Sequence, residues 1–388
     1  MSLSMAETVE NSPRLKAAPL IVHVVRQFLP NRGGLEDVVA NLARQTLKRG
    51  YRVRVVTLNS LFTAPDDKLP ARETIDGIEV IRIPWSGSSR YPIAPQIFRH
   101  IGDAHLIHVH AIDFFFDALA WGRFLHRKPM VVTTHGGFFH TKKFLVLKKV
   151  WFRTLTRLSA IAYRRVVCCS ASDLSQFVQI VPDGMTIENG ADIGKFADAA
   201  SHTPERRIVT IGRFSVNKRL DLLLDAIAAL LKRNPDWHLD IIGAESDLDT
   251  ADVRREIAAR LLEASITLTV SPDNHVIGGI IAKASLMASA SEYEGFGIVA
   301  LEAMSAGLQP VLNSNEAYRS LAGRHEAIIL ADFTKPEAAA DAIEEAYRKV
   351  ATEGAALRRK LIEAADAYSW DAVAERYIDL YRSIGIAV

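Results

Sequence analysis

The sequence predicts an α/β protein of two doubly wound, Rossmann-like domains, each with a parallel sheet covered by helices. Short apolar runs of strand length alternate with segments whose apolar residues recur at helical spacing. This alternation is typical of a parallel sheet buried on both faces. The pattern pauses in the polar, alanine-rich segment 190–206 and then restarts, and a length of 388 residues suits two domains.

In the first half, "LIVHVVRQF" (20–28) reads as a buried strand and "GGLEDVVANLARQTLKRG" (33–50) as the helix after it. Residues 1–17 are polar, contain no apolar signal-peptide core and are predicted to be disordered. Further strands of the first half are predicted at 51–59, 78–84, 106–111, 129–135, 164–170 and 185–190.

The second half opens with a strand at 206–213 and a helix at 219–235. We place the domains at 18–190 and 191–388, and the last helix is a candidate to cross back to the first domain. Further strands of the second half are predicted at 237–244, 266–270, 286–291 and 310–314.

Composition excludes several classes of protein. A net charge of +2 does not favour nucleic-acid binding, and no apolar run reaches the roughly 20 residues of a membrane span. Cys168 and Cys169 are adjacent, so they cannot easily chelate one metal or form a relaxed disulfide. We interpret them as buried thiols in a reducing, cytoplasmic compartment.

Candidate functional residues of the first half follow its strands, where open α/β sheets bind ligands. Gly33 and Gly34 stand at the start of a helix, as either a phosphate cradle or a simple tight turn. His135 ends a strand before two glycines, where it either contacts a sugar hydroxyl or bonds the backbone. His110 and Asp113 form a similar, weaker pair after the preceding strand.

The second half carries charged candidates. Arg213 and Lys218 lie across a strand-to-helix turn and suit a diphosphate, with two solvated basic residues as the alternative. Glu294 lies in a glycine-flanked loop and Glu302 in the helix that follows. The two carboxylates are too far apart to share a proton, but they can accept hydrogen bonds from the hydroxyls at opposite ends of one ligand. A nucleotide sugar meets all these requirements.

The segment 138–158 interleaves basic and aromatic residues and contains no acidic residue. Such a segment suits an anionic bilayer surface, while a core helix with a solvated basic side is the alternative. The lysines on which the membrane interpretation depends are Lys142, Lys143, Lys148 and Lys149.

The sequence resembles the retaining glycosyltransferases of family 4 in the motifs "RGGLE", "ENGAD", "GRFSVNK" and "EYEGFGIVALE", taken together. In the last motif, seven residues separate Glu294 from Glu302. These enzymes have the GT-B fold, in which two Rossmann-like domains face a deep cleft. The resemblance covers nearly the whole chain. It implies that 18–190 binds the acceptor and 191–388 the nucleotide sugar. It also implies a metal-independent reaction, in which a basic pair does the work of a cation.

The resemblance assigns roles residue by residue. It implies that Glu302 binds the ribose, that Glu294 and His135 contact the donor sugar, and that Arg213 and Lys218 neutralise the leaving diphosphate. On this basis the catalytic residues are His135, Arg213, Lys218 and Glu294, and the acceptor or membrane side has His110, Asp113 and the four lysines. The donor-binding residues are Gly33, Gly34, Arg213, Lys218, Gly295, Phe296, Gly297 and Glu302.

Within this family, "HGGFFHTKK" and "SASEYEGFG" are similar to bacterial α-mannosyltransferases of exopolysaccharide biosynthesis. That similarity implies GDP-mannose as donor, a polyprenyl-diphosphate-linked oligosaccharide as acceptor, and a place on the inner face of the cell membrane. A UDP-sugar transferase and a nucleotide-sugar 2-epimerase remain as alternatives. Gln309 and "IIGAESD" depart from the common pattern near the expected base site, and Asp247-x-Asp249 is interpreted as a solvated loop or helix start.

Overall fold

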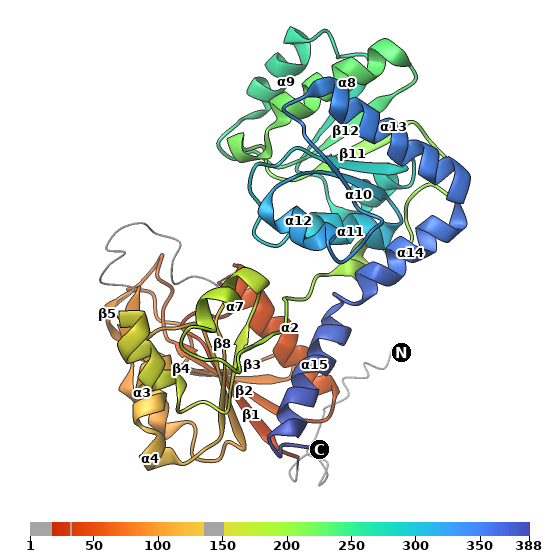
Figure 1. Cartoon of the computed structure of the whole chain (residues 1–388). Coiled ribbons are helices and arrows are strands. Elements are labelled where there is room, and N and C mark those ends of the chain that lie inside the picture. Colours follow the sequence, from red (N-terminus) through yellow and green to blue (C-terminus); the bar gives the residue numbers. More distant parts are fainter. Residues whose placement is uncertain (1–17, 32, 136–150) are drawn as a thin grey trace, which may run out of the picture. The chain divides into compact units, whose positions relative to one another are not determined.

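The computed structural model describes residues 18–31, 33–135 and 151–388. The chain divides into two compact units, and each is described by itself below. The first unit contains residues up to Gly190 together with Trp370–Val388, and the second contains Ala191–Ser369. The last helix therefore belongs to the first unit, although it is separated from the rest of that unit in sequence (Figure 1).

The first unit is built on an eight-stranded sheet in the order β10-β9-β8-β7-β1-β2-β4-β3. All of its described pairings are parallel except that of β3 with β4. The central strands are fully buried, as their continuous apolar runs predict. Its strands are β1 (Leu20–Val24), β2 (Arg52–Leu58), β3 (Arg72–Ile75), β4 (Ile78–Ile83), β7 (Leu106–His110), β8 (Met130–Thr133), β9 (Arg165–Cys168) and β10 (Met185–Thr186).

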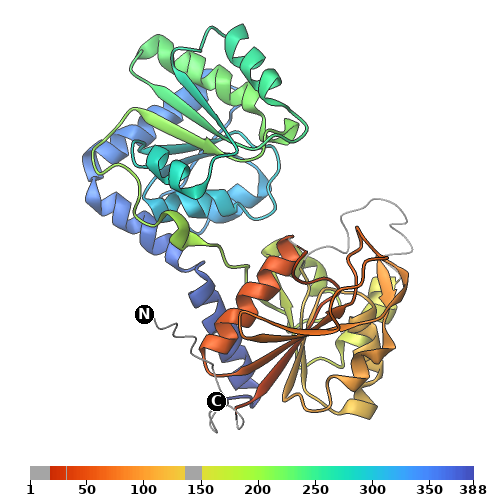
Figure 2. The same cartoon turned by 180° about the vertical axis from the view of Figure 1, so that it is seen from behind.

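The last helix, α15 (Trp370–Ser383), packs beside α2 (Gly34–Lys48), as Figures 1 and 2 show. Tyr377 and Tyr381 of α15 share a buried cluster with Ile21 of β1 and Leu42 of α2. The unit's other elements are the hairpin β5 (Ser86–Ser88) and β6 (Tyr91–Ile93), η1 (Pro95–Arg99), α3 (Phe114–Trp121), α4 (Arg123–His126), η2 (Phe152–Thr156), α6 (Arg157–Ala160) and α7 (Ala171–Phe177).

The second unit has a six-stranded parallel sheet in the order β13-β12-β11-β14-β15-β16. Its strands are β11 (Arg207–Ile211), β12 (His238–Gly243), β13 (Ile266–Val270), β14 (Leu286–Ser289), β15 (Gln309–Asn313) and β16 (Ile329–Ala331). Its helices are η3 (Ile193–Phe196), η4 (Val216–Lys218), α8 (Leu220–Arg233), α9 (Thr250–Ala259), α10 (Asn274–Ile281), α11 (Ile298–Ala306), α12 (Glu316–Ala322), α13 (Pro336–Glu353) and α14 (Ala355–Asp366).

The fold class predicted from the sequence is confirmed, since both units are doubly wound α/β layers (Figure 1). The strands that the sequence did not predict are short or at a sheet edge, namely β3, β5, β6 and β16. Among the described residues, no helix combines the length and apolar character needed to cross a bilayer. The predicted disordered segment 1–17 lies outside the described residues.

Candidate active site

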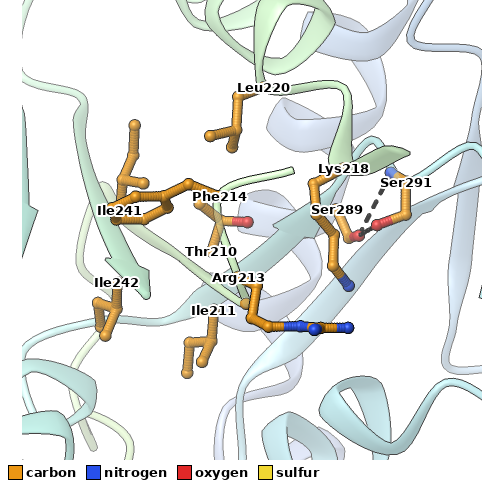
Figure 3. A pocket seen from close by; sticks show the side chains of 11 residues that line it. Thr210, Ile211, Arg213, Phe214, Lys218, Leu220, Ile241, Ile242, Ser289 and Ser291 are labelled. Carbon is orange, nitrogen blue, oxygen red and sulfur yellow. Dashed lines mark hydrogen bonds between the residues drawn. The ribbon is translucent and has the colours of Figure 1, made fainter. Parts of the chain in front are cut away.

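The second unit gathers charged side chains at the carboxyl ends of two neighbouring strands. Arg213 and Lys218 follow β11, and Glu294 follows β14, which pairs directly with β11. Ligands of open α/β sheets bind at this edge. A small pocket lies here (Figure 3), lined by Thr210, Ile211, Gly212, Arg213, Phe214, Lys218, Leu220, Ile241, Ile242, Ser289 and Ser291.

The turn after β11 depends on a close approach to the end of β12. A Cβ on Gly243 would lie 1.8 Å from the carbonyl oxygen of Gly212, so only glycine fits at position 243. A Cβ on Gly212 would meet Cε of Lys218 at 3.0 Å. The missing side chain at Gly212 thus leaves room for the aliphatic part of Lys218 to lie over the strand end.

Lys218 and Glu294 form an ion pair in which Nζ and Oε1 are 2.5 Å apart. Their side chains are 20% and 16% exposed, so solvent screens this pair less than an open surface pair. Two hydrogen bonds hold the loops together: Asn217 Nδ2 donates to the carbonyl of Tyr293, and the amide of Glu292 donates to the carbonyl of Asn217. The pair is therefore fixed by both loops.

Tyr318 of α12 supports Glu294 from below. Its hydroxyl lies 3.3 Å from Oε1 of Glu294 and 3.1 Å from Oγ of Ser289. Figure 3 shows the contact of Ser289 with Ser291, whose hydroxyl oxygens are 3.0 Å apart. Burial, together with the Glu294 charge, raises the pKa of Tyr318, so the hydroxyl stays protonated as a donor. Lys218 and Tyr318 both contact Oε1 of Glu294. The other oxygen, Oε2, has no hydrogen-bond partner among the described residues.

Arg213 is exposed and forms no ion pair with any described residue. Figure 3 shows its guanidinium and the Lys218 ammonium projecting to the same side of the pocket. Lys218 uses one of its three N–H donors on Glu294 and retains the others. Two cationic groups with free donors suit an anion such as a diphosphate.

The helix α11 begins beside this site, and the N–H groups of its first turn add to the positive charge of Arg213 and Lys218. Gly297 caps it with φ of +83°, a conformation that favours glycine. A Cβ on Gly297 would also lie 2.8 Å from Cδ1 of Leu321. Gly295 is exposed with no neighbouring atom within 4 Å of its Cβ position, and the ring of Phe296 packs edge-on against Tyr368. The loop is thus anchored at Phe296 and open at Gly295.

Glu302 lies in the second turn of α11 and is 15% exposed. Burial raises the pKa of Glu302, which the Lys195 charge opposes and Asp192 reinforces. The Lys195 ammonium is 3.9 Å away, too far for a close hydrogen bond. η3, which carries Lys195, is held to α11 by Ser305 Oγ donating to the carbonyl of Ile193 at 2.7 Å. The Glu302 carboxylate therefore retains capacity to accept hydrogen bonds from a ligand.

At Gly33 and Gly34 of the first unit, an acidic side chain already occupies the helix start. A Cβ on Gly33 would lie 2.6 Å from Oε2 of Glu36, and Glu36 also accepts a hydrogen bond from Asn31 Nδ2 at 2.9 Å. Gly34 has no atom within 4 Å of its Cβ position. Because the Glu36 carboxylate repels anions, the described geometry here suits a polar neutral group better than a phosphate.

A chain of three histidines leads from the core of the first unit to the end of β8. His23 Nδ1 lies 2.9 Å from His110 Nε2, and His110 Nδ1 lies 3.1 Å from His135 Nε2. His135 is half-buried with φ of +53°, a left-handed conformation that histidine adopts more readily than most residues. Burial lowers the pKa of His23 to about 3 and lowers those of His110 and His135, so all three imidazoles are neutral.

The hydrogen-bond pattern also sets the direction of this chain. His23 Nε2 is buried with no partner among the described residues, and a buried unpaired N–H is rarer than a buried unpaired acceptor. We therefore expect the proton of His23 on Nδ1, donated to His110. His110 then donates from Nδ1 to His135, which leaves His135 protonated on its own Nδ1. Both nitrogens of His110 are engaged, so none is left for an acceptor sugar.

His23, His108 and His110 lie close enough together to raise the question of a metal site, since one nitrogen from each falls within 4.8 Å of the others. However, His108 uses Nδ1 on Tyr381 and Nε2 on Thr133, at 2.7 and 2.8 Å. Only His23 Nε2 is unengaged among the six ring nitrogens. This set does not fit a metal ion, and we interpret it as a packed polar core under α15.

Two aspartates that the sequence singled out, Asp113 and Asp249, cap helices. Asp113, predicted to face the acceptor, is buried and accepts a hydrogen bond from the amide of Phe115 at the start of α3. Its burial raises its pKa to about 7, which the Arg26 charge opposes. Asp249 caps α9 in a reciprocal capping box with Asp252, and Asp247 accepts from the Val216 amide. The interpretation of Asp247-x-Asp249 as a helix start is confirmed.

Comparison with known proteins assigns the family. Residues 32–195 match the family model "Glycosyltransferase Family 4", and residues 195–368 match "Glycosyl transferases group 1". The chain is 42% identical over 366 residues to the GDP-mannose:cellobiosyl-diphosphopolyprenol alpha-mannosyltransferase of Komagataeibacter xylinus, covering 94% of this chain and 93% of that protein. The chain belongs to glycosyltransferase family 4. The family predicted from the motifs is thus confirmed.

Other relatives of this glycosyltransferase agree. The protein of the same name from Xanthomonas campestris is also 42% identical, over 94% of this chain and 96% of its own. The phosphatidyl-myo-inositol mannosyltransferase of Mycobacterium tuberculosis (strain CDC 1551 / Oshkosh) is 28% identical over 91% of this chain and 93% of its own. This glycosyltransferase is therefore similar to mannosyltransferases along nearly its whole length.

Solved structures show that this glycosyltransferase has the GT-B fold. A glycosyltransferase from Rickettsia africae ESF-5 aligns with a TM-score of 0.68 at 17% identity, over 95% of this chain and 98% of that one. The Anabaena protein HepE in complex with UDP aligns with the same TM-score and identity, over 94% of this chain and all of that one. At this level of identity the likeness concerns the fold alone.

Several site residues of this glycosyltransferase were not found from sequence. Tyr318 and Ser289 lie in apolar surroundings typical of core, and Lys195 lies in the segment interpreted as a domain boundary. His23 sits within a predicted strand, where a single histidine gives no signal of its own. Lys142, Lys143, Lys148 and Lys149 lie outside the described residues, so the prediction for them stays a prediction.

Proposed function

We propose that this glycosyltransferase transfers mannose from GDP-mannose to a polyprenyl-diphosphate-linked oligosaccharide, with retention of anomeric configuration, in exopolysaccharide biosynthesis. The observation that carries the proposal is the 42% identity, over 94% of the chain, to proteins named for that donor and that class of acceptor. The charged strand ends of the second unit support it, because they offer partners for each part of a nucleotide sugar.

The donor's ribose is assigned to Glu302. Vicinal hydroxyls donate hydrogen bonds, and a carboxylate accepts them at both oxygens. The nearest cation, Lys195, is 3.9 Å from Glu302, so it balances the charge without occupying the carboxylate. The half-buried position also makes the contact more favourable than it would be in open water.

The diphosphate is assigned to Arg213, Lys218 and the first amides of α11. When the glycosidic bond breaks, negative charge accumulates on the leaving diphosphate, and positioned cations stabilise that charge in the transition state. Lys218 is held in place by Glu294 at 2.5 Å, so little reorganisation is needed when the charge develops. Under this proposal no metal ion takes part, because the two side chains supply the positive charge.

The sugar is assigned to the free oxygen of Glu294, and the resemblance to the family separately implies a sugar contact from His135. Oε2 of Glu294 can accept from a sugar hydroxyl, while the neutral His135 can donate from Nδ1. We propose a front-face displacement, since the described site places no carboxylate as a separate nucleophile. The bond from the anomeric carbon to the phosphate oxygen breaks, the acceptor oxygen bonds on the same face, and its proton passes to the departing phosphate.

A lipid-linked acceptor would bring the reaction to the membrane. We propose that the protein is cytoplasmic and lies peripherally on the inner face of the cell membrane. The acceptor class named for the relatives supports this position, because its polyprenyl chain stays in the bilayer.

Transfer from radiolabelled GDP-mannose to synthetic cellobiosyl-diphosphopolyprenol tests the proposal. We expect labelled lipid whose new linkage is α by the NMR signal of its anomeric proton, with EDTA present throughout. Preferential transfer from a UDP-sugar, or a β linkage, would contradict the donor or the retaining outcome. Conversion of GDP-mannose into a different nucleotide sugar without acceptor would instead identify a 2-epimerase.

A further inference from the structure

Large apolar side chains are exposed together on one side of the first unit. Exposed fractions reach 85% for Phe124 and 82% for Leu125 of α4, and 57% for Trp121 at the end of α3. Leu158 of α6 and Ile161 just beyond it are 63% and 68% exposed. Single exposed apolar residues are ordinary, but a group of them on neighbouring elements indicates an interaction site.

The elements that carry these residues are neighbours. α3 contacts both α4 and α6, and Ser159 Oγ of α6 donates to Asp117 of α3 at 2.6 Å. The segments after α4 and α6 enter the paired strands β8 and β9, where the Arg164 amide donates to the Met130 carbonyl at 2.7 Å. Figures 1 and 2 both show α3 and α4 on the side of this unit away from α15.

The two faces of the α6 region differ sharply. Ser159 and Tyr163 point inward, and the ring of Tyr163 stacks on Phe116 of α3. Ser159 and Tyr163 fill the inner face, and Leu158 and Ile161 point outward. Covering these side chains with another apolar phase would remove apolar surface from water, which is favourable.

The stretch of chain that carries this surface is rich in basic residues. Between Asp117 and Asp173 the sequence has no acidic residue and eleven lysines and arginines, in a chain whose net charge is only +2. Arg123, Arg127 and Arg157 are exposed and form no ion pair with any described residue. Apolar side chains flanked by unpaired arginines match the boundary between the acyl chains and the anionic head groups of a bilayer.

We propose that this α4–α6 surface, made of Trp121, Phe124, Leu125, Leu158, Ile161 and the neighbouring arginines, lies on an anionic lipid bilayer. The proposed surface overlaps the segment 138–158 predicted from sequence only at Arg157 and Leu158, and it does not depend on the four lysines of that segment. Its role rests on the proposed lipid-linked acceptor, whereas its chemistry rests on the surface alone.

Co-sedimentation with vesicles, without donor or acceptor, tests the surface itself. We expect the full-length protein to bind vesicles of equal parts phosphatidylcholine and phosphatidylglycerol at low salt, to be released by high salt, and to ignore phosphatidylcholine alone. Phe124→Ser with Leu125→Ser, and separately Arg123→Glu with Arg127→Glu, should each weaken binding by about tenfold or more. The matched control is Leu261→Ser, an 87%-exposed leucine of the second unit, which should bind like the wild type.

Slow hydrolysis of GDP-mannose in all variants checks that they are folded and keeps this test separate from the proposed function. Unchanged vesicle binding by both double variants would overturn the proposal, as would a wild type that ignores anionic vesicles or self-associates instead. Loss of binding only when Lys142, Lys143, Lys148 and Lys149 are all changed to Glu would also overturn it. Loss in the α4 variants with normal hydrolysis and normal transfer to a short-chain, water-soluble acceptor supports it.

Discussion

The two units place opposite kinds of chemistry at the carboxyl ends of their strands. In the second unit the groups are ionic: Lys218 pairs with Glu294, Glu302 is half-buried, and Arg213 forms no ion pair with the residues that the structure describes. In the first unit they are neutral imidazoles whose pKa values burial lowers. The same doubly wound topology thus ends in an ionic cluster in the second unit, here called the charged edge, and in a chain of neutral histidines in the first unit, here called the neutral edge. A charged edge suits a nucleoside diphosphate, and a neutral one suits sugar hydroxyls.

At the charged edge, the largest loss of transfer is expected when Glu294 is replaced. Glu294→Ala should reduce transfer by several orders of magnitude, because it removes both the sugar contact and the group that positions Lys218. The measurement is kcat with the lipid-linked acceptor, with circular dichroism to show that the fold is intact. Tyr318→Phe, which removes the hydroxyl contacts to Glu294 and Ser289 but leaves the ion pair of Glu294 with Lys218, should cost far less. Near-normal turnover of Glu294→Ala would remove the central role of this carboxylate.

The cations should act on the chemical step. Arg213→Ala and Lys218→Ala should each lower kcat by on the order of 10²–10³, as single-donor deletions do elsewhere, with smaller changes in the donor KM. Lys232→Ala, an exposed lysine at the end of α8, is the matched control and should have no effect. Full rescue of either variant by added Mg²⁺ would mean that a metal ion, and not the side chains, neutralises the leaving group.

The buried histidines of the neutral edge should make the stability of the protein depend on pH. His23, His108 and His110 are buried with lowered pKa values, so the folded state binds fewer protons than the unfolded chain, whose histidines titrate near 6.5. Their contribution is present above that pH and is lost as the pH falls below it. Each should cost about 1.4 kcal/mol of stability per pH unit there. Thermal unfolding midpoints measured down to pH 5 check this, with replacement of the exposed His275 by Gln as control.

A midpoint that is flat between pH 7 and 5 would show that these histidines are not buried neutral in solution. The variant His108→Phe should reduce the slope, because it removes one of the three titrating groups. It should also loosen α15, since His108 bonds Tyr381.

A smaller effect is expected at Glu302. Ribose contacts are made equally in the ground state and the transition state, so Glu302→Ala should raise the donor KM by about tenfold and leave kcat nearly unchanged. Lys195→Ala serves as the comparison, because it removes the cation 3.9 Å away without touching the carboxylate. If Glu302→Ala instead lowers kcat with an unchanged KM, this carboxylate acts in the transition state and the ribose assignment fails.

The sequence predicted the charged edge better than the neutral one, for a physical reason. Glycine-flanked loops and a carboxylate within an apolar helix break the pattern of core residues, so Glu294, Glu302 and Lys218 stand out. Tyr318 and Ser289 do not, because both types are common in cores. The histidine chain becomes visible only when β1 and β7 pair and bring His23 opposite His108.

The fold itself followed from apolar periodicity, and its omissions have the same origin. The unpredicted strands β3 and β16 are short edge strands with little buried surface, so their pattern is weak. The place of α15 in the first unit depends on long-range packing of Tyr377 and Tyr381. The phosphate interpretation of Gly33 stays a prediction, and the sequence alone did not show that the Glu36 carboxylate lies beside Gly33.

Ligand-induced thermal stabilisation tests the central claim, a guanine-nucleotide site on the charged edge of the second unit, most directly. At a ligand concentration of about 100 Kd, binding adds about 2.7 kcal/mol to the free energy of unfolding. GDP should therefore raise the melting temperature more than UDP or ADP, with or without EDTA, and the rise should shrink in Arg213→Ala and Glu302→Ala but persist in His110→Phe. A larger shift with UDP or ADP, or a GDP shift that survives both second-unit variants, would contradict it.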